Sequence, residues 1–203
     1  FVQTPSRHLA QLTYDGTWGE WRDLGGVLSS SPAVTALRAR PHLDVAALMD
    51  DQSRTGVWVR SWPYRRPCYV GAEACGVCAE SCDGACRRGA RLVGSPYVYR
   101  RAGTDDVVVS AAEDGHIYEF SRGSAWALTD LSLAAPSSAL AADDPMAYVR
   151  SDGYSSVVYR AIDGGVDELF SLSPAGGSGA LTEYAQLGYA KSKPFGYVRV
   201  NPA

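Results

Sequence analysis

The chain has 203 residues, of which 46% are hydrophobic and 20% are charged, and its formal net charge is −3. This balance argues against a nucleic-acid-binding protein, which would normally carry a clustered basic excess. No apolar run approaches the ~18–20 residues that a bilayer-spanning segment needs. A chain that starts at Phe1 without a visible signal peptide is typical of a processed secretory protein, or of a piece of a longer chain. We therefore expect a secreted protein without a membrane span.

The N-terminal segment already belongs to a repeat. His8 stands ten residues before Trp18, and His116 stands ten residues before Trp126. Because the two histidines share a repeat position, we expect both to have a structural role at the surface or in a turn.

The first complete copy of the repeat opens at Pro32 and is longer than the later ones. It starts 64 residues before Pro96, whereas the spacing between later copies is 49 residues. The excess falls within residues 63–94, directly after Trp62. We predict that this segment is a cysteine-rich insertion in the second repeat unit.

Each later copy is marked by a proline that is followed by Tyr at the third place and by Arg at the fifth. The three sets are Pro96 with Tyr99 and Arg101, Pro145 with Tyr148 and Arg150, and Pro194 with Tyr197 and Arg199. In the Pro32 copy, Thr35 and Leu37 take the places of Tyr and Arg. Asp-Gly pairs at 114–115 and 163–164 keep the same phase.

Short runs of β-branched and aromatic residues, separated by Asp-Gly turns and Gly/Ser clusters, fill each repeat. Several strands in a repeat of 40–50 residues indicate a β-propeller blade, so we predict an all-β propeller of four blades, a single domain over residues 1–203.

Phe1 aligns with Val109 in the middle of a repeat. We therefore expect residues 194–200 to supply the first strand of the blade that residues 1–24 continue. A ring closed by strands from both termini has no open sheet edge.

Two stretches resemble known propeller lectins. Residues 18–34 resemble the bacterial propeller-lectin repeat W-x-x-W-x-x-L-G-G-x-L-x-S-x-P-A-V. Residues 145–169 are similar to tandem repeats of secreted actinobacterial proteins akin to fucose-binding lectins. The resemblance implies blade architecture and a sugar held between blades by an Arg, a Glu and an aromatic ring. Activity follows less directly, since one fold carries many functions.

The matched glutamates are Glu119 and Glu168, and Gln11 and Val59 replace them in the other copies. The arginine place of the lectin family holds Val107 and Ser156. The three-part fucose site is therefore not carried over intact, and its chemistry is absent or rearranged.

Tyr and Arg two residues apart point to the same face of a strand. If that strand is innermost, the three Tyr-x-Arg units converge on the central channel. Two interpretations stay open for these arginines: donors to sugar hydroxyls, or ties between blades through an acidic neighbour or a carbonyl. As ligand-binding candidates we name the glutamates with their Tyr-x-Arg units: Glu119, Glu168, Tyr99, Arg101, Tyr148, Arg150, Tyr197 and Arg199.

The tryptophans form two groups. Trp18, Trp62 and Trp126 recur in phase, which favours a role in the core between blades, with ligand stacking as the alternative. Trp21 and Trp58 lie outside this phase. An indole can cover the apolar C–H face of a pyranose, so we name Trp21 and Trp58 as a sugar platform.

Enzyme signatures are absent from the sequence: it has neither a His-x-x-x-His nor a Gly-x-Ser-x-Gly motif. The acidic pairs at 105–106 and 143–144 are expected to be solvated turn residues, with a weak calcium site as the alternative. We expect no catalysis and no cofactor.

The sequence favours a carbohydrate-binding module whose partners are glycans, including those of cell surfaces, or other subunits of a secreted complex. The alternative is a protein-interaction scaffold that docks a partner through the propeller face or the cysteine-rich loop.

The five cysteines all fall within the insertion: Cys68, Cys75, Cys78, Cys82 and Cys86. Little apolar bulk is available to hold such a loop, and two disulfides would do so in an oxidising compartment. A zinc or iron–sulfur site is the alternative, since Cys75 and Cys78 have ligand spacing, but a second such pair is missing. The odd cysteine suggests a bridge to another chain or segment.

The disulfide interpretation can be tested by mass spectrometry without reductant. We predict that at least four of the five cysteines are paired and that no metal is bound. Stoichiometric zinc or iron would contradict it.

Overall fold

The computed structural model is almost entirely β-structure in the part of the chain that it describes. The described residues are 1–36, 43–51, 54–62, 68–71, 91–101, 107–122, 126–151, 153–170, 183–189 and 191. Within them the only helix is the single turn α1 (Leu131–Ala134). The all-β prediction is confirmed.

Four antiparallel sheets follow one another along the chain, and in each the strands are joined in chain order. The first sheet has three strands, β1 (Val2–Gln3), β2 (Leu9–Gln11) and β3 (Arg22–Gly25). The second has four strands, β4 (Ala33–Ala36), β5 (Leu43–Asp51), β6 (Arg54–Trp62) and β7 (Cys68–Gly71).

The other two sheets repeat the four-stranded order. The third sheet consists of β8 (Leu92–Tyr99), β9 (Val107–Ala112), β10 (Ile117–Arg122) and β11 (Trp126–Asp130). The fourth sheet consists of β12 (Met146–Val149), β13 (Ser155–Arg160), β14 (Gly165–Phe170) and β15 (Glu183–Tyr189). The sequence repeat and the sheets share one phase, because Pro32 and Pro145 directly precede a first strand and Pro96 lies within one.

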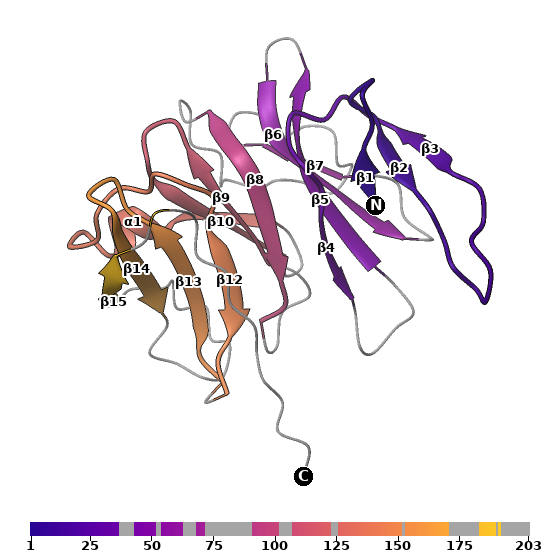
Figure 1. Ribbon diagram of the computed structural model, residues 1–203. Helices are drawn as coiled ribbons and strands as arrows, with labels where there is room; N and C mark the ends of the chain where they lie inside the picture. The colour runs from indigo at the N-terminus through magenta and orange to yellow at the C-terminus, as the bar shows by residue number, and fades with distance from the viewer. Residues whose placement is uncertain are drawn as a thin grey trace.

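Each sheet packs against the next through an apolar cluster, in the order in which the sheets follow one another in Figure 1. Leu9 of the first sheet meets Val45 and Ala47 of the second. Ala46 and Leu48, on the opposite face of β5, join the cluster shared with the third sheet.

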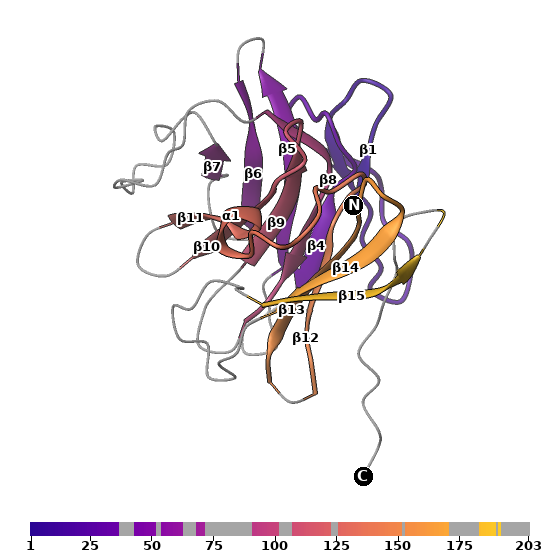
Figure 2. The ribbon, with the colours of Figure 1, turned by 90° about the vertical axis from the view of Figure 1, so that its left-hand side faces the viewer.

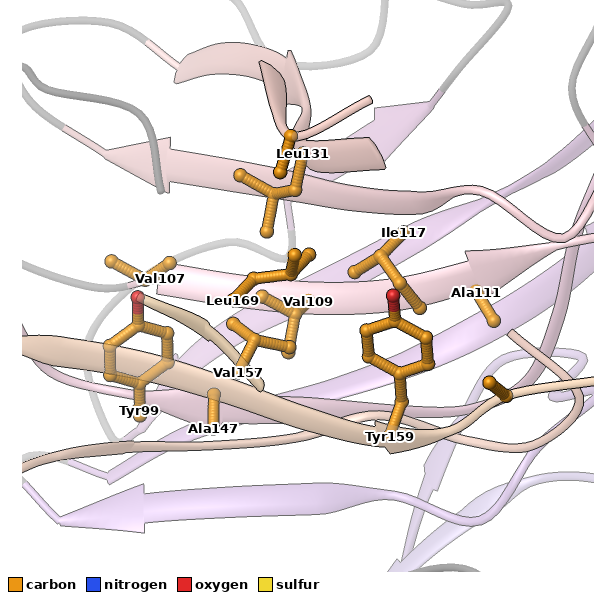
Figure 3. Packing of buried hydrophobic residues seen from close by; sticks show 12 residues of the cluster. Tyr99, Val107, Val109, Ala111, Ile117, Leu131, Ala147, Val157, Tyr159 and Leu169 are labelled. Atoms are coloured by element: carbon orange, nitrogen blue, oxygen red, sulfur yellow. The ribbon is translucent and has the colours of Figure 1, made fainter. Parts of the chain in front are cut away.

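The largest cluster lies between the third and fourth sheets, where Tyr99, Ile117 and Val109 meet Val157 and Tyr159 (Figure 3). The helix α1 lies beside β10, in agreement with the side view of Figure 2, and Leu131 adds its side chain to this cluster.

Strand β9 is apolar at five of its six positions because both of its faces are covered. Val108 belongs to the cluster toward the second sheet, whereas Val107 and Val109 belong to the cluster toward the fourth. All six residues of β9 are buried. A strand covered on both faces loses the alternation of apolar and polar residues that a half-buried strand shows, which explains the run of Val107 to Ala112.

Hairpin turns recur at the same place in the repeat. Gly115 and Gly164 have φ values of 80° and 86°, and in each turn the preceding aspartate accepts a hydrogen bond from a backbone N–H two residues on. Arg7 takes the corresponding position near the N-terminus with φ 66°, a conformation that is costly for a residue with a Cβ. Its Nε donates to Leu28 O at 2.9 Å, which helps to hold this turn.

Several sequence predictions are corrected or lie outside the described residues. Trp18 is 68% exposed, so its predicted place in the core between blades is wrong; it sits on a hairpin that projects beyond the sheet. The acids at 143–144 do more than line a turn: Asp143 accepts from Arg160 Nε at 2.7 Å, and Asp144 accepts from Ser95 N at 2.8 Å. The acids at 105–106 and residues 192–203 lie outside the described part, and so do four of the five cysteines.

Candidate functional site

The third sheet brings together the first Tyr–Arg–Glu set named from the sequence. Arg101 contacts the carboxylate of Glu119 through Nη2, and the same Nη2 donates to the Tyr99 hydroxyl at 2.9 Å. The Tyr99 hydroxyl donates to Glu119 Oε2 at 3.3 Å. Arg101 Nε also donates to Ser155 Oγ at 3.2 Å, on strand β13 of the next sheet. The set therefore ties two sheets together.

Burial controls the electrostatics of this tie. Arg101 is 9% exposed and Glu119 is 2% exposed in their side chains. Burial raises the pKa of the Glu119 carboxyl, although the Arg101 guanidinium opposes that rise. Burial is the largest single influence on the pKa of Arg101 and works to lower it, but the interactions with Glu119 and Tyr99 together outweigh burial, and the pKa is raised. Burial and the nearby Glu119 charge also raise the pKa of the Tyr99 hydroxyl.

The fourth sheet holds the second set in a looser arrangement. The Tyr148 hydroxyl donates to Glu168 Oε1 at 3.2 Å, and Ser156 Oγ also donates to this oxygen. Arg150 Nη1 lies 4.0 Å from Glu168 Oε1, and its side chain is 37% exposed. Burial, followed by the Glu168 charge, raises the pKa of the Tyr148 hydroxyl.

Arg150 also lies against two aromatic rings. Its guanidinium carbon is 5.9 Å from the centroid of the Tyr154 ring and 5.7 Å from that of Phe170. This arrangement is a cation–π contact of a partly exposed arginine. A cation next to aromatic rings and a carboxylate can donate hydrogen bonds to a polar ligand, whereas the enclosed Arg101 set cannot without moving the sheets apart.

The β2–β3 hairpin carries a third group, made of exposed aromatic residues. Tyr14 and Trp18 face each other across its tip, with ring centroids 5.0 Å apart and planes tilted by 54°. Tyr14 is 62% exposed and Trp21, directly before β3, is 58% exposed. Gly16, with φ 102°, allows the tight turn between the two rings.

Trp21 was named from the sequence, but Tyr14 was missed. An Asp-Gly pair flanked by Tyr14 and Trp18 is a hairpin signal, and it could have placed the two rings on one turn. The side chain of Trp58 lies outside the described residues, as do Tyr197 and Arg199. Cys68 begins β7, but neither its side chain nor Cys75, Cys78, Cys82 or Cys86 is described.

His8 and His116, which share a repeat position, each lie next to an aspartate. His8 Nδ1 lies 2.9 Å from Asp23 Oδ2, and His116 Nδ1 lies 2.9 Å from Asp130 Oδ2. The hydrogen bond with His8, followed by that from the Gly25 N–H, lowers the pKa of the Asp23 carboxyl. Asp130 also caps α1 by accepting from Leu133 N. These contacts fit the structural role expected for both histidines.

Neither a comparison with protein-family models nor a search of curated proteins finds a match for this chain. In the described ranges, no three His, Cys, Asp or Glu side chains gather into a group that could hold a metal ion. No helix among the described residues is long and apolar enough to cross a membrane.

The two glutamates make a matched pair for a stability test. Glu119→Gln leaves the buried Arg101 charge uncompensated, and we predict a loss of about 3 kcal/mol in the free energy of unfolding. Glu168→Gln should cost about 1 kcal/mol or less, since the Gln carbonyl can still accept from Tyr148 and Ser156 and the charge of Arg150, 37% exposed, is screened by solvent. Urea denaturation of both variants measures the difference, and equal losses would contradict the assignment of Glu119 to the tie.

Proposed function

We propose that this protein is a carbohydrate-binding β-propeller module of a secreted protein, built from four blades. The fold part of the proposal is supported by the four sheets in register with the sequence repeat and by their face-to-face packing in chain order. The first sheet has three strands among the described residues. Residues 194–200, which carry the third copy of the Pro-x-x-Tyr-x-Arg pattern, are the proposed source of its missing first strand.

The observation that carries the binding function is the exposed aromatic group Tyr14, Trp18 and Trp21. Large aromatic side chains normally lose most of their surface on folding, yet each of these three keeps more than half of it exposed. Aromatic rings cover the apolar C–H face of a sugar, while the hydroxyl of Tyr and the N–H of Trp can hydrogen-bond to its polar rim. The three rings on one hairpin therefore support a platform for a pyranose.

The set of Tyr148, Arg150 and Glu168 is the proposed second contact region, because the Arg150 side chain is 37% exposed although that of Glu168 is only 10% exposed. A carboxylate accepts from sugar hydroxyls and an arginine donates to them. The buried set of Tyr99, Arg101 and Glu119 already satisfies these groups internally, so we assign it to the scaffold. With few competent sites, we expect binding constants in the millimolar to micromolar range, or roughly 4–8 kcal/mol.

The proposal is tested by measuring the binding of the intact chain to a panel of immobilised mono- and oligosaccharides, followed by titration with any saccharide it binds. Replacing Trp18 and Trp21 together by Ala should weaken that binding by roughly 5- to 150-fold, because each aromatic contact contributes about 0.5–1.5 kcal/mol. The melting temperature should change little, since both side chains are exposed.

Tyr189→Ala is the matched control, because Tyr189 is also a strongly exposed aromatic residue but lies on β15, away from the hairpin. Its affinity for the same saccharide should equal that of the parent. An equal loss in both variants would contradict the platform. A parent protein that binds no saccharide of the panel would contradict the carbohydrate function and favour the protein-interaction scaffold.

A further inference from the structure

Five Asp-Gly pairs occur in the chain, and the structure describes three of them in full: those at 15–16, 114–115 and 163–164. The pairs at 83–84 and 152–153 include residues outside the described part. In an Asp-Gly pair the backbone nitrogen of the glycine can attack the side-chain carboxyl of the aspartate, because glycine has no Cβ to shield it. The reaction requires that neither group be held elsewhere.

The turn at Asp114 holds both reacting groups. The Gly115 N–H donates to Ala112 O at 2.9 Å, so the nitrogen is already engaged. Asp114 Oδ1 accepts from His116 N at 2.9 Å, and Oδ2 accepts from the Tyr118 hydroxyl at 3.1 Å. Attack at this pair must first break these bonds.

The turn at Asp163 repeats the arrangement one copy later. The Gly164 N–H donates to Ala161 O at 2.9 Å, and Asp163 Oδ1 accepts from Gly165 N at 2.7 Å. The residue after the Asp-Gly pair differs between the two turns. The turn itself therefore restrains both reacting groups in each copy.

The pair at the tip of the β2–β3 hairpin has no such restraint. Among the described residues, the Gly16 N–H donates no hydrogen bond and the Asp15 carboxylate accepts none. A Cβ at Gly16 would meet no atom within 4 Å, whereas one at Gly115 would lie 2.8 Å from Leu140 Cβ. All three aspartates are exposed, so hydrogen bonding and not exposure separates this pair from the other two.

We propose that Asp15 and Gly16 form a succinimide spontaneously in the native protein and that Asp15 is thereby converted to isoaspartate. The Gly16 nitrogen forms a bond to Asp15 Cγ and loses its proton, and one carboxyl oxygen leaves as water. Water then opens the ring at one of its two carbonyls. Opening at Cγ restores aspartate, and opening at the α-carbonyl gives isoaspartate. One water leaves and one enters, so no other reactant is needed.

Isoaspartate changes the backbone between two residues of the exposed aromatic group. It adds a methylene to the chain between Tyr14 and Trp18, whose ring centroids lie 5.0 Å apart. The short turn between them is closed by Asp15 N donating to Thr17 O at 3.3 Å. The longer backbone should separate the two rings. A loss of saccharide binding on isomerisation rests on the proposed function, whereas the isomerisation itself does not.

Peptide mapping after incubation of the intact chain in water enriched in oxygen-18 measures the reaction. Each ring opening introduces one heavy oxygen, and trypsin places the three aspartates on separate peptides, 8–22, 102–122 and 161–191. Dividing the rate in urea by the native rate removes the intrinsic reactivity of each pair. The ratio should be close to one at Asp15. It should be roughly fivefold or more at Asp114 and Asp163, since at least two hydrogen bonds must break there and each slows the reaction roughly two- to tenfold. A ratio at Asp15 as large as at the other two would overturn the proposal.

Asp15→Glu is the matched variant, because it keeps the charge but must close a six-membered ring, which forms more slowly. On ageing, nuclear Overhauser effects between the rings of Tyr14 and Trp18 should decline in the parent as isoaspartate accumulates and persist in Asp15→Glu. Ring contacts that survive in the purified isoaspartyl form would contradict the expected separation. Neither measurement uses a glycan, so a chain that binds no saccharide can still pass both, and a lectin can fail them.

Discussion

The inner sheets of this protein are each covered on both faces by a neighbour, and this mutual burial governs the rest of the structure. Strands β5 and β9 contribute side chains of alternate residues to two different clusters. If either neighbour were removed, the second or the third sheet would therefore expose apolar side chains to solvent. Burial of this kind is the dominant favourable contribution to folding. It also raises a topological requirement, because a row of stacked sheets must leave two outer faces uncovered unless the row closes on itself.

Polar groups within these interfaces set the position of one sheet relative to the next. Arg101 reaches from the end of β8 to Glu119 on its own sheet and to Ser155 on the next. A buried ion pair adds little net stability compared with apolar packing, but it strongly penalises arrangements that separate the partners. We interpret the buried set of Tyr99, Arg101 and Glu119 as a device that fixes the orientation of the third sheet relative to the fourth.

The repeat made the all-β fold and the positions of the sheets predictable, because a fixed spacing of Pro, Tyr, Arg and Asp-Gly reports the strands and turns of each unit. It also placed Tyr99, Arg101 and Glu119 together correctly. Their burial was not predictable, since Arg101 and Arg150 have the same place in the repeat and differ in exposure through contacts with other strands. Trp18 shows the opposite case. Its phase suggested the core, but a hairpin long enough to project beyond the sheet carries it into solvent.

The central claim is that residues 194–200 and the N-terminal sheet form one blade, and interstrand nuclear Overhauser effects test it most directly. In the third and fourth sheets the residue after the repeat proline faces its partner on the second strand, as Tyr97 faces Val109 and Met146 faces Val158. In the proposed four-bladed ring, the same register would pair Phe195 with Phe1. The account predicts backbone cross-peaks between Phe1 and Phe195 in the monomer. Random-coil shifts and exclusively sequential cross-peaks for residues 194–200 would contradict it.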